Sequence, residues 1–419
     1  MRLFYIDDTL TNKISYYLLL AFLVALPFEM FYSEMLLVCL LIHTLIHVDR
    51  LRPFRLQPAL LLVIALYLLT MAGTLYSHDQ PQAWKDWEKQ LALVLFPLIF
   101  SFNRLDLQKY KLLLFKGFGL SCLFTVIYLY IDAWRTLRYN GLGVRQLFTA
   151  PFMNHNFSMP IDLHATYFSM YIAFSLITFA WLLIRARRWS LDQFLYGLAL
   201  LILLAALLQL ASRAVWAAVV VMGLTIPFLL MQRKQARRFL LIALPLALCL
   251  LFALVKVSTF TDRYIVDLRD DLSVSAEDPG VLEPRVVRWK CALELIRASP
   301  WIGYGTGTEV ALLKESYFDH RLYSSYVHEL NAHNEYLSFW LKTGLAGLLV
   351  FIVVLAAGVR RAIRSRDAFF SGFLAIVLCV SFSENILDTN KGIFFFAFFF
   401  SLFFATSSLG KPDPEGSPI

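Results

Sequence analysis

Long runs of apolar residues constrain the fold of this chain more than any other feature of its sequence. The runs are roughly 17 to 22 residues long, which is the length that a helix needs to cross about 30 Å of hydrocarbon. Hydrophobic residues make up 59% of the 419 residues and charged residues only 16%, whereas soluble chains carry about 25% charged residues. These observations exclude a soluble enzyme, a secreted disulfide scaffold and a disordered chain. They predict an all-α, polytopic integral membrane protein.

Twelve of these apolar blocks are predicted to be membrane-spanning helices. Their approximate ranges are 14–30, 34–48, 57–75, 90–103, 112–131, 163–184, 192–210, 214–231, 239–257, 335–358, 368–385 and 392–409. The chain then divides into spans one to nine (1–257), a large loop (258–334), spans ten to twelve (335–409) and a polar, Pro-rich tail (410–419). Because no basic n-region or small-residue cleavage site accompanies the first block, we expect it to remain as an uncleaved span.

Positive residues are distributed unevenly between the two sides of the predicted membrane. The loops rich in Lys and Arg are 49–56, 104–111, 185–191, 232–238 and 359–367. The short loops on the other side hold only Lys85, Lys89, Arg213 and Lys391. The positive-inside rule therefore places both termini in the cytoplasm and the long segments 132–162 and 258–334 outside. The net charge of +8 reflects this sorting rather than one basic face, so we expect membrane lipids and no nucleic acid as partners.

The loop between spans nine and ten contains a predicted amphipathic helix over 283–296. Its apolar positions, spaced by three and four, are Val286, Trp289, Leu293 and Ile296, and Pro300 ends the pattern. Arg285 and Arg288 lie near its N-terminal end, where forked guanidinium groups and free backbone N–H groups suit a phosphate or diphosphate. The alternative is a solvated face whose charge is balanced by Glu283.

Histidines in the same loop resemble a zinc motif without fulfilling it. His328 and His333 are five residues apart, which turns them about 140° from one another on a helix, so we expect no zinc site. The acidic stretch 267–278 could bind a divalent ion, although a solvated loop is the stronger interpretation. His333 stands at the outer water boundary, where a neutral imidazole can act as a general base. A histidine that is merely tolerated at the interface is the alternative.

Other polar residues gather at the same outer face. Arg213 lies at the start of span eight. It either binds a substrate or only extends its side chain to the membrane–water interface. Glu384 and Lys391 are spaced so that they can pair, and His164 opens span six. The glycines between Gly303 and Gly307 lack a preceding strand, so they predict a tight loop rather than a dinucleotide site.

Several short motifs in this part of the chain resemble the O-antigen ligase and polymerase superfamily. They are Ser212-Arg213-Ala214, Arg285-x-x-Arg288-Trp289, Ser299-Pro300-Trp301-Ile302-Gly303-Tyr304-Gly305-Thr306-Gly307, Ala332-His333-Asn334-Glu335-Tyr336-Leu337 and Gly344-Leu345-Ala346-Gly347. Their order and spacing over about 210–350 match that family. The layout of twelve spans with a large outer loop between spans nine and ten also looks like the ligases.

The resemblance implies an inverting, metal-independent glycosyltransferase that works without a cofactor at the periplasmic face of a bacterial inner membrane. Such enzymes transfer O-antigen glycan from undecaprenyl diphosphate to lipid A–core in lipopolysaccharide biosynthesis. By this resemblance Arg213 and Arg285 bind the diphosphate, and His333 accepts the proton of the acceptor. We place five further residues beside them as substrate-binding residues: Arg288, Asn334, His164, Glu384 and Lys391.

Three alternative functions remain at the level of sequence. The O-antigen polymerase uses a second lipid-linked glycan as acceptor. Protein O-oligosaccharyltransferases usually carry a soluble domain after the last span, whereas this sequence stops about ten residues beyond it. A transporter of lipid-linked sugars would line the membrane midplane with charge, but the predicted spans hold almost none apart from Lys116.

Overall fold

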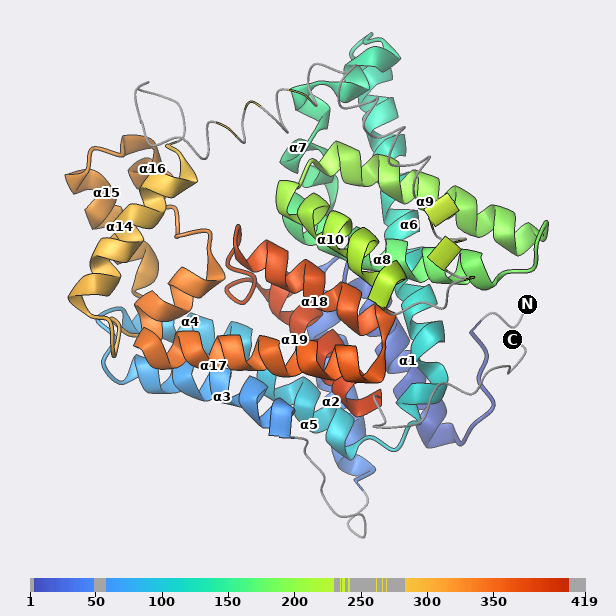
Figure 1. Cartoon of the computed structure of the whole chain (residues 1–419), viewed down its shortest axis with the longest axis horizontal. Helices are drawn as coiled ribbons and strands as arrows, with labels where there is room; N and C mark the ends of the chain where they lie inside the picture. The colour runs from blue at the N-terminus through green and yellow to red at the C-terminus, as the bar shows by residue number, and fades with distance from the viewer. Residues whose placement is uncertain are drawn as a thin grey trace.

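The computed structural model describes residues 4–48, 58–229 and 283–406, together with a few single positions between 230 and 282. Within these ranges every regular element is a helix, which confirms the all-α prediction (Figure 1). The predicted span 239–257 and the acidic stretch 267–278 lie outside the described residues apart from single positions, and the tail 410–419 lies wholly outside them.

Each predicted span within the described ranges coincides with a helix. These helices are α1 (Leu10–Ala25), α2 (Met30–Ile46), α3 (Pro58–Thr74), α5 (Ala92–Phe102), α6 (Leu107–Tyr139), α8 (Ala165–Arg185), α9 (Leu191–Leu210), α10 (Arg213–Leu229), α17 (Glu335–Ser365), α18 (Ala368–Ser381) and α19 (Asn390–Thr406). Of these, α6, α8, α9 and α17 are long and apolar enough to cross a membrane, and six others are shorter apolar helices. The chain is therefore membrane-embedded, while the number of twelve spans stays a prediction.

Two spans are unusual in length: α5 is as short as its predicted range 90–103 implies, whereas α6 extends well beyond its predicted range 112–131. Helix α5 has 11 residues and rises only about 16 Å, half of the hydrocarbon thickness, and the amphipathic helix α4 (Gln80–Gln90) precedes it. Helix α6 has 33 residues and continues to Tyr139, so the predicted outer segment 132–162 begins as helix. The short elements η1 (Val144–Phe148), η2 (Ala150–Phe152), α7 (His155–Ser158) and η3 (Met159–Ile161) complete that segment.

The core of the bundle is built around α19. This helix is apolar on all sides and buried along its length, and it packs against α5, α6 and α18 (Figure 1). Its Phe395 and Phe399 contact the rings of Phe174 on α8 and Phe373 on α18. Aromatic side chains of this size each bury a large apolar area, and here they join these helices.

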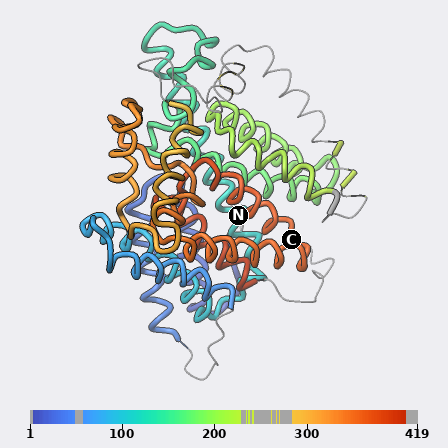
Figure 2. Tube along the Cα trace, turned by 60° about the vertical axis from the view of Figure 1, so that its left-hand side comes forward, coloured from blue at the N-terminus to red at the C-terminus, as the bar shows by residue number. Residues whose placement is uncertain are grey.

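The large loop folds into a helical cap with an apolar core of its own. Its described helices are α14 (Arg285–Ala298), α15 (Glu309–Asp319) and α16 (Tyr323–Val327), which form one flank of the molecule in both views (Figures 1 and 2). Buried residues of this core include Cys291, Ala292, Leu313 and Tyr317. The cap thus holds its elements together by packing rather than by disulfides or metal ligands within its described residues.

The predicted helix of the cap is confirmed, but its predicted buried face is partly wrong. Helix α14 ends at Ala298, shortly before Pro300, and buries Arg288, Cys291, Ala292 and Ile296. Small side chains allow close packing under α15, whereas the indole of Trp289 stays partly exposed and donates to Ala332 O at 3.0 Å. The solvated-face alternative is wrong for Arg288, which is only 2% exposed.

Helix α17 contains a break that the apolar pattern did not predict. Thr343 and Gly344 have non-helical backbone angles, and Gly344 has φ 64° and ψ −162°. The loop 300–305 packs into the break, where Gly305 N donates to Lys342 O at 2.8 Å and Leu345 N to Pro300 O at 2.9 Å. A Cβ atom at Gly344 would lie 2.1 Å from Trp301 O, so only glycine fits there. The predicted tight loop between Gly303 and Gly307 is confirmed.

Candidate active site

The loop before α17 and the loop after α18 bring His333 and Glu384 into contact. His333 Nδ1 lies 3.1 Å from Glu384 Oε2, although the two residues are 51 positions apart. Because a carboxylate only accepts hydrogen bonds, Nδ1 carries the hydrogen and Nε2 of a neutral ring carries the lone pair. His333 keeps 24% of its side chain exposed, whereas Glu384 keeps 9%. This arrangement orients an accessible imidazole nitrogen for proton transfer.

Two further residues from distant elements surround Glu384. Arg285, at the start of α14, donates from Nη1 to Ser383 O at 3.2 Å and places Nη2 3.8 Å from Glu384 Oε1. Thr166, in the first turn of α8, donates to the same Oε1 at 3.3 Å. His164 precedes α8 and acts electrostatically on Glu384. We refer to His333, Glu384, Arg285 and His164 as the outer cluster.

Glu384 lies in the loop between α18 and α19 and stays ionised. Burial would raise the pKa of its carboxyl, but the hydrogen bond from His333, the charge of Arg285 and the charges that the two imidazoles carry in acid outweigh burial and lower this pKa to about 2. A fixed negative charge beside Nδ1 stabilises the imidazolium that forms when Nε2 takes a proton.

His164 is held as a neutral donor at the start of α8. Its Nδ1 accepts from Thr166 N at 3.3 Å as the cap of the helix, so the hydrogen of the neutral ring lies on Nε2. Burial, opposed in part by Glu384, lowers the pKa of His164 to about 4. His155 of α7 repeats this arrangement by accepting from Ala165 N at 3.3 Å, with the two rings 4.0 Å apart. Sequence reasoning missed His155, because no motif marks the short helix that carries it.

Arg213 lies at the same end of the bundle. It begins α10, four residues after Gln209 of α9. Gln209 Nε2 donates to Leu147 O at 2.6 Å and also to Phe152 O, and Asn154 N donates to Gln209 O at 2.9 Å. These contacts connect the turn that precedes Arg213 to the segment 147–154, and a role of Arg213 at the site stays a prediction.

Three other predicted substrate ligands occupy structural positions. Asn334 is the cap of α17 and accepts from Tyr336 N and Leu337 N. Arg288 is buried in the cap close to Tyr317. Lys391 donates to Leu26 O at 2.9 Å and to Phe28 O at 3.5 Å at the turn between α1 and α2. Direct substrate contacts for these three stay predictions.

The predicted pairing of Glu384 with Lys391 is wrong. Glu384 pairs with His333 and Arg285, whereas the ammonium group of Lys391 binds backbone carbonyls. Six residues of loop and helix start separate the two side chains, and helix α19 begins at Asn390 with Lys391 turned toward α1. The spacing of the two residues in the sequence could not predict the direction of the Lys391 side chain.

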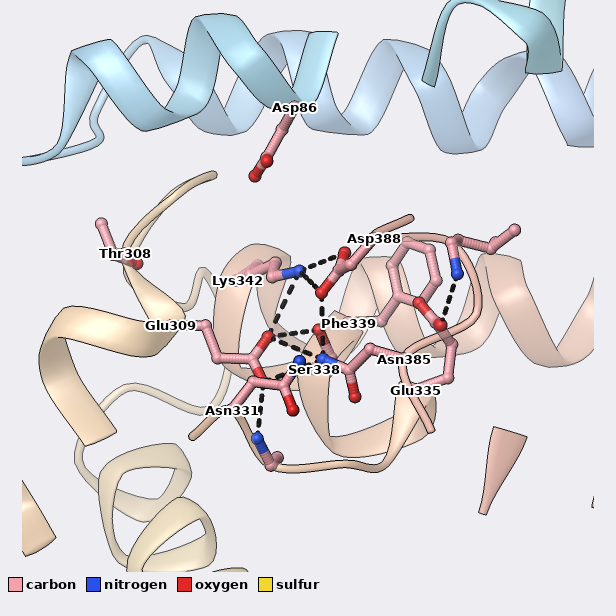
Figure 3. A network of polar contacts seen from close by, with 12 residues as sticks. Asp86, Thr308, Glu309, Asn331, Glu335, Ser338, Phe339, Lys342, Asn385 and Asp388 are labelled. Carbon is pink, nitrogen blue, oxygen red and sulfur yellow. Dashed lines mark hydrogen bonds and ion pairs between the residues drawn. The ribbon is translucent and has the colours of Figure 1, made fainter. Parts of the chain in front are cut away.

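A buried polar network adjoins the outer cluster. Figure 3 shows Glu309 at its centre, with Ser338 and Lys342 of α17 and with Asn385 and Asp388 of the loop after α18. Lys342 Nζ lies 3.2 Å from Glu309 Oε2 and 2.7 Å from both carboxylate oxygens of Asp388. Among the residues that the structure describes, no group of three or more His, Cys, Asp or Glu side chains is arranged to hold a metal ion. Sequence reasoning missed this network because its members occur singly along the chain.

Comparison with known families identifies part of the chain. Residues 198–352 match the family described as O-antigen ligase. This segment is similar to the O-antigen ligase family. The resemblance predicted from the motifs is thereby confirmed, and it supports an activity of the O-antigen ligase and polymerase type. No curated protein matches the chain.

The segment that matches the O-antigen ligase family supplies only part of the outer cluster. Arg213, Arg285 and His333 lie within 198–352, together with Glu309 and Lys342 of the buried network. Glu384, Asn385 and Asp388 come from the chain beyond that segment, and His164 comes from the chain before it. The geometry around His333 therefore depends on parts of the chain on both sides of the matched segment.

Proposed function

We propose that this protein is an inverting, metal-independent O-antigen ligase. It joins a glycan carried on undecaprenyl diphosphate to a sugar hydroxyl of lipid A–core, at the periplasmic face of the bacterial inner membrane. The observation that carries the proposal is the contact of His333 Nδ1 with Glu384 Oε2 next to Arg285. It supplies an oriented base and a cation at the end of the bundle where the predicted orientation places the periplasm.

The proposed reaction is a single displacement at the anomeric carbon of the donor sugar. The acceptor hydroxyl oxygen forms the new glycosidic bond, and its proton passes to His333 Nε2. The bond between the anomeric carbon and the phosphate oxygen breaks, and its electron pair leaves with undecaprenyl diphosphate. Attack on the face opposite the leaving group inverts the anomeric centre. Glu384 stabilises the imidazolium formed in this step.

Arg285 and Arg213 are proposed to bind the diphosphate. The leaving group gains negative charge as the glycosidic bond breaks, so a fixed guanidinium stabilises the transition state more than the ground state. A planar guanidinium can bind two phosphate oxygens at once, which a lysine ammonium group does not reproduce. His164, as a neutral Nε2–H donor, is suited to a phosphate or sugar oxygen without adding charge.

The test is a deletion of the gene in its own host, followed by separation of lipopolysaccharide on a gel. We expect the deletion strain to lack long-chain lipopolysaccharide and to accumulate long glycan on the lipid carrier. Complementation with wild-type protein should restore transfer, and complementation with His333→Ala should reduce it by about 100-fold or more at equal protein level in the membrane.

Each other outcome points to a defined alternative. Core capped by a single repeat in the deletion strain would assign the chain as an O-antigen polymerase. Unchanged lipopolysaccharide together with loss of glycosylated protein would assign a protein O-oligosaccharyltransferase. Full activity of His333→Ala would remove the base from the proposed mechanism.

A further inference from the structure

Glu309 connects the two backbone segments that carry His333 and Glu384. Its Oε1 accepts from Ala332 N at 3.0 Å, and Ala332 immediately precedes His333. The same Oε1 accepts from Asn385 Nδ2 at 3.1 Å, and Asn385 immediately follows Glu384. One carboxylate on α15 thus holds the neighbours of both members of the proposed catalytic pair (Figure 3).

Asn385 closes this connection from the other side. Its Oδ1 accepts from Asn334 N at 2.8 Å, so the residues before and after His333 are both fixed. Asn385 is 2% exposed and Asn334 is 5% exposed, which protects these bonds from competition by water. The position of the His333 backbone relative to the Glu384 backbone is therefore set by hydrogen bonds that do not involve either side chain.

Lys342 compensates the buried charge of Glu309. It lies on the arm 335–342 of α17, just before the break at Gly344, and binds Glu309 and Asp388. Ser338 of the same arm donates to Glu309 Oε2, and Glu335 accepts from Leu387 N at 2.8 Å. Replacing buried ion pairs by apolar side chains is often neutral for stability, so stability alone is weak grounds for such a network.

We propose that Glu309 is a positioning residue that aligns His333 with Glu384 for proton transfer. The proposal rests on the proposed function, since it assigns Glu309 a role through the catalytic pair. The four partners that the Glu309 carboxylate has among the described residues are all hydrogen-bond donors: Ala332 N, Asn385 Nδ2, Ser338 Oγ and Lys342 Nζ. Glu309→Gln keeps the size of the side chain but turns an amide NH2 group, which cannot accept a hydrogen bond, toward one of these donors. The substitution therefore weakens the hydrogen bonds that join the two backbone segments.

The experiment is a double-mutant cycle between Glu309→Gln and Glu384→Gln, with transfer measured on purified full-length protein as kcat and KM for the donor. A misplacement near 1 Å at a reacting centre costs up to about 100-fold in rate, so we expect Glu309→Gln to lower kcat by about 10- to 100-fold and to leave KM within about 2-fold. In the Glu384→Gln background the second substitution should lower kcat by less than about 2-fold. The acid limb of the pH–rate profile should move to lower pH in Glu309→Gln, because a misaligned carboxylate supports the imidazolium less.

The matched control is Glu329→Gln, which changes an exposed glutamate of the same cap that pairs with Lys314. It should leave kcat, KM and the pH profile unchanged. If Glu309→Gln fails to accumulate in the membrane, Asn385→Ala replaces it, because it removes the bonds to Glu309 and to Asn334 N. An equal effect of Glu309→Gln in both backgrounds, or an unmoved acid limb, would overturn the positioning role. Full activity of Glu384→Gln and His333→Ala would instead overturn the proposed function.

Discussion

His333 adopts a backbone conformation that is uncommon for residues other than glycine. Its φ is 45°, in the left-handed region, and its amide donates to Asn331 Oδ1 at 3.0 Å. Such a conformation costs of the order of 1 kcal/mol or more and persists where the surroundings determine it. The bonds from Ala332 to Glu309 and from Asn334 to Asn385 provide those surroundings. These bonds hold the backbone in the position from which the imidazole contacts Glu384.

The two contacts of Arg285 predict how its substitution affects transfer. Its Nη1 binds Ser383 O while Nη2 faces Glu384, so a single ammonium group cannot occupy both positions. We expect Arg285→Ala to lower kcat/KM for the donor by about 100-fold or more and Arg285→Lys to recover only part of it. The measurement is transfer by purified protein at several donor concentrations. Full recovery by lysine would show that charge alone is needed.

At the scale of elements, α17 is two arms joined at Gly344. The arm 335–342 carries Ser338 and Lys342 into the buried network, and the arm 345–365 belongs to the bundle. The loop 300–305 fills the space between them and bonds to both. The break thus separates the part of the helix that serves the site from the part that crosses the bundle.

Gly344→Ala should destabilise the protein. The substitution places a Cβ atom against Trp301 O and imposes a side chain on a backbone conformation that is essentially restricted to glycine, at a cost of at least about 1–3 kcal/mol. Thermal unfolding of the detergent-solubilised protein measures the effect. Gly223→Ala is the matched control, because a Cβ at Gly223 meets nothing within 4 Å and its melting temperature should stay the same or rise.

The sequence predicted the helices far better than their internal geometry. Apolar runs are sufficient to predict α8 or α18, because burial of a continuous stretch leaves little choice of structure. The break in α17 depends on a loop some 40 residues away, and the length of α6 on residues outside the membrane, so neither follows from local hydrophobicity.

The candidate site was predictable where residues cluster in motifs. Arg285 and His333 stand in such motifs, and the structure places both against Glu384. Glu384 itself was singled out by its position at a helix end, but its partner was predicted wrongly. Glu309 and Asn385 had no signal beyond being polar residues near the membrane, since their role arises only when three distant segments meet.

At the scale of the whole molecule, acid should destabilise the protein through His164. Its pKa is lowered from 6.5 to about 4 in the folded state, so the unfolded chain binds the proton more readily between these values. Stability is therefore lost as the pH falls from about 6.5 toward 4. Glu384, with its pKa lowered from 4.5 to about 2, adds a loss only below about pH 4.5.

The measurement is the melting temperature of the solubilised protein between pH 7.5 and 5. We expect a loss of roughly 1–2 kcal/mol in wild type from His164, equivalent to a few °C. His164→Asn retains an oxygen that can cap α8 at Thr166 N but removes the titrating ring, so its melting temperature should fall less over this range. Parallel curves for the two proteins would contradict the assignment.

The buried network includes residues beyond residue 352, and this affects how the chain can be shortened to a fragment. A fragment trimmed to 198–352 would retain Glu309 and Lys342 but discard Asn385 and Asp388, which bind them. It would also discard the carboxylate that faces the imidazole of His333. In such a fragment Glu309 and Lys342 would lose partners that they have in the intact protein. The segment that matches the family in sequence is therefore shorter than the part of the chain that builds the proposed site.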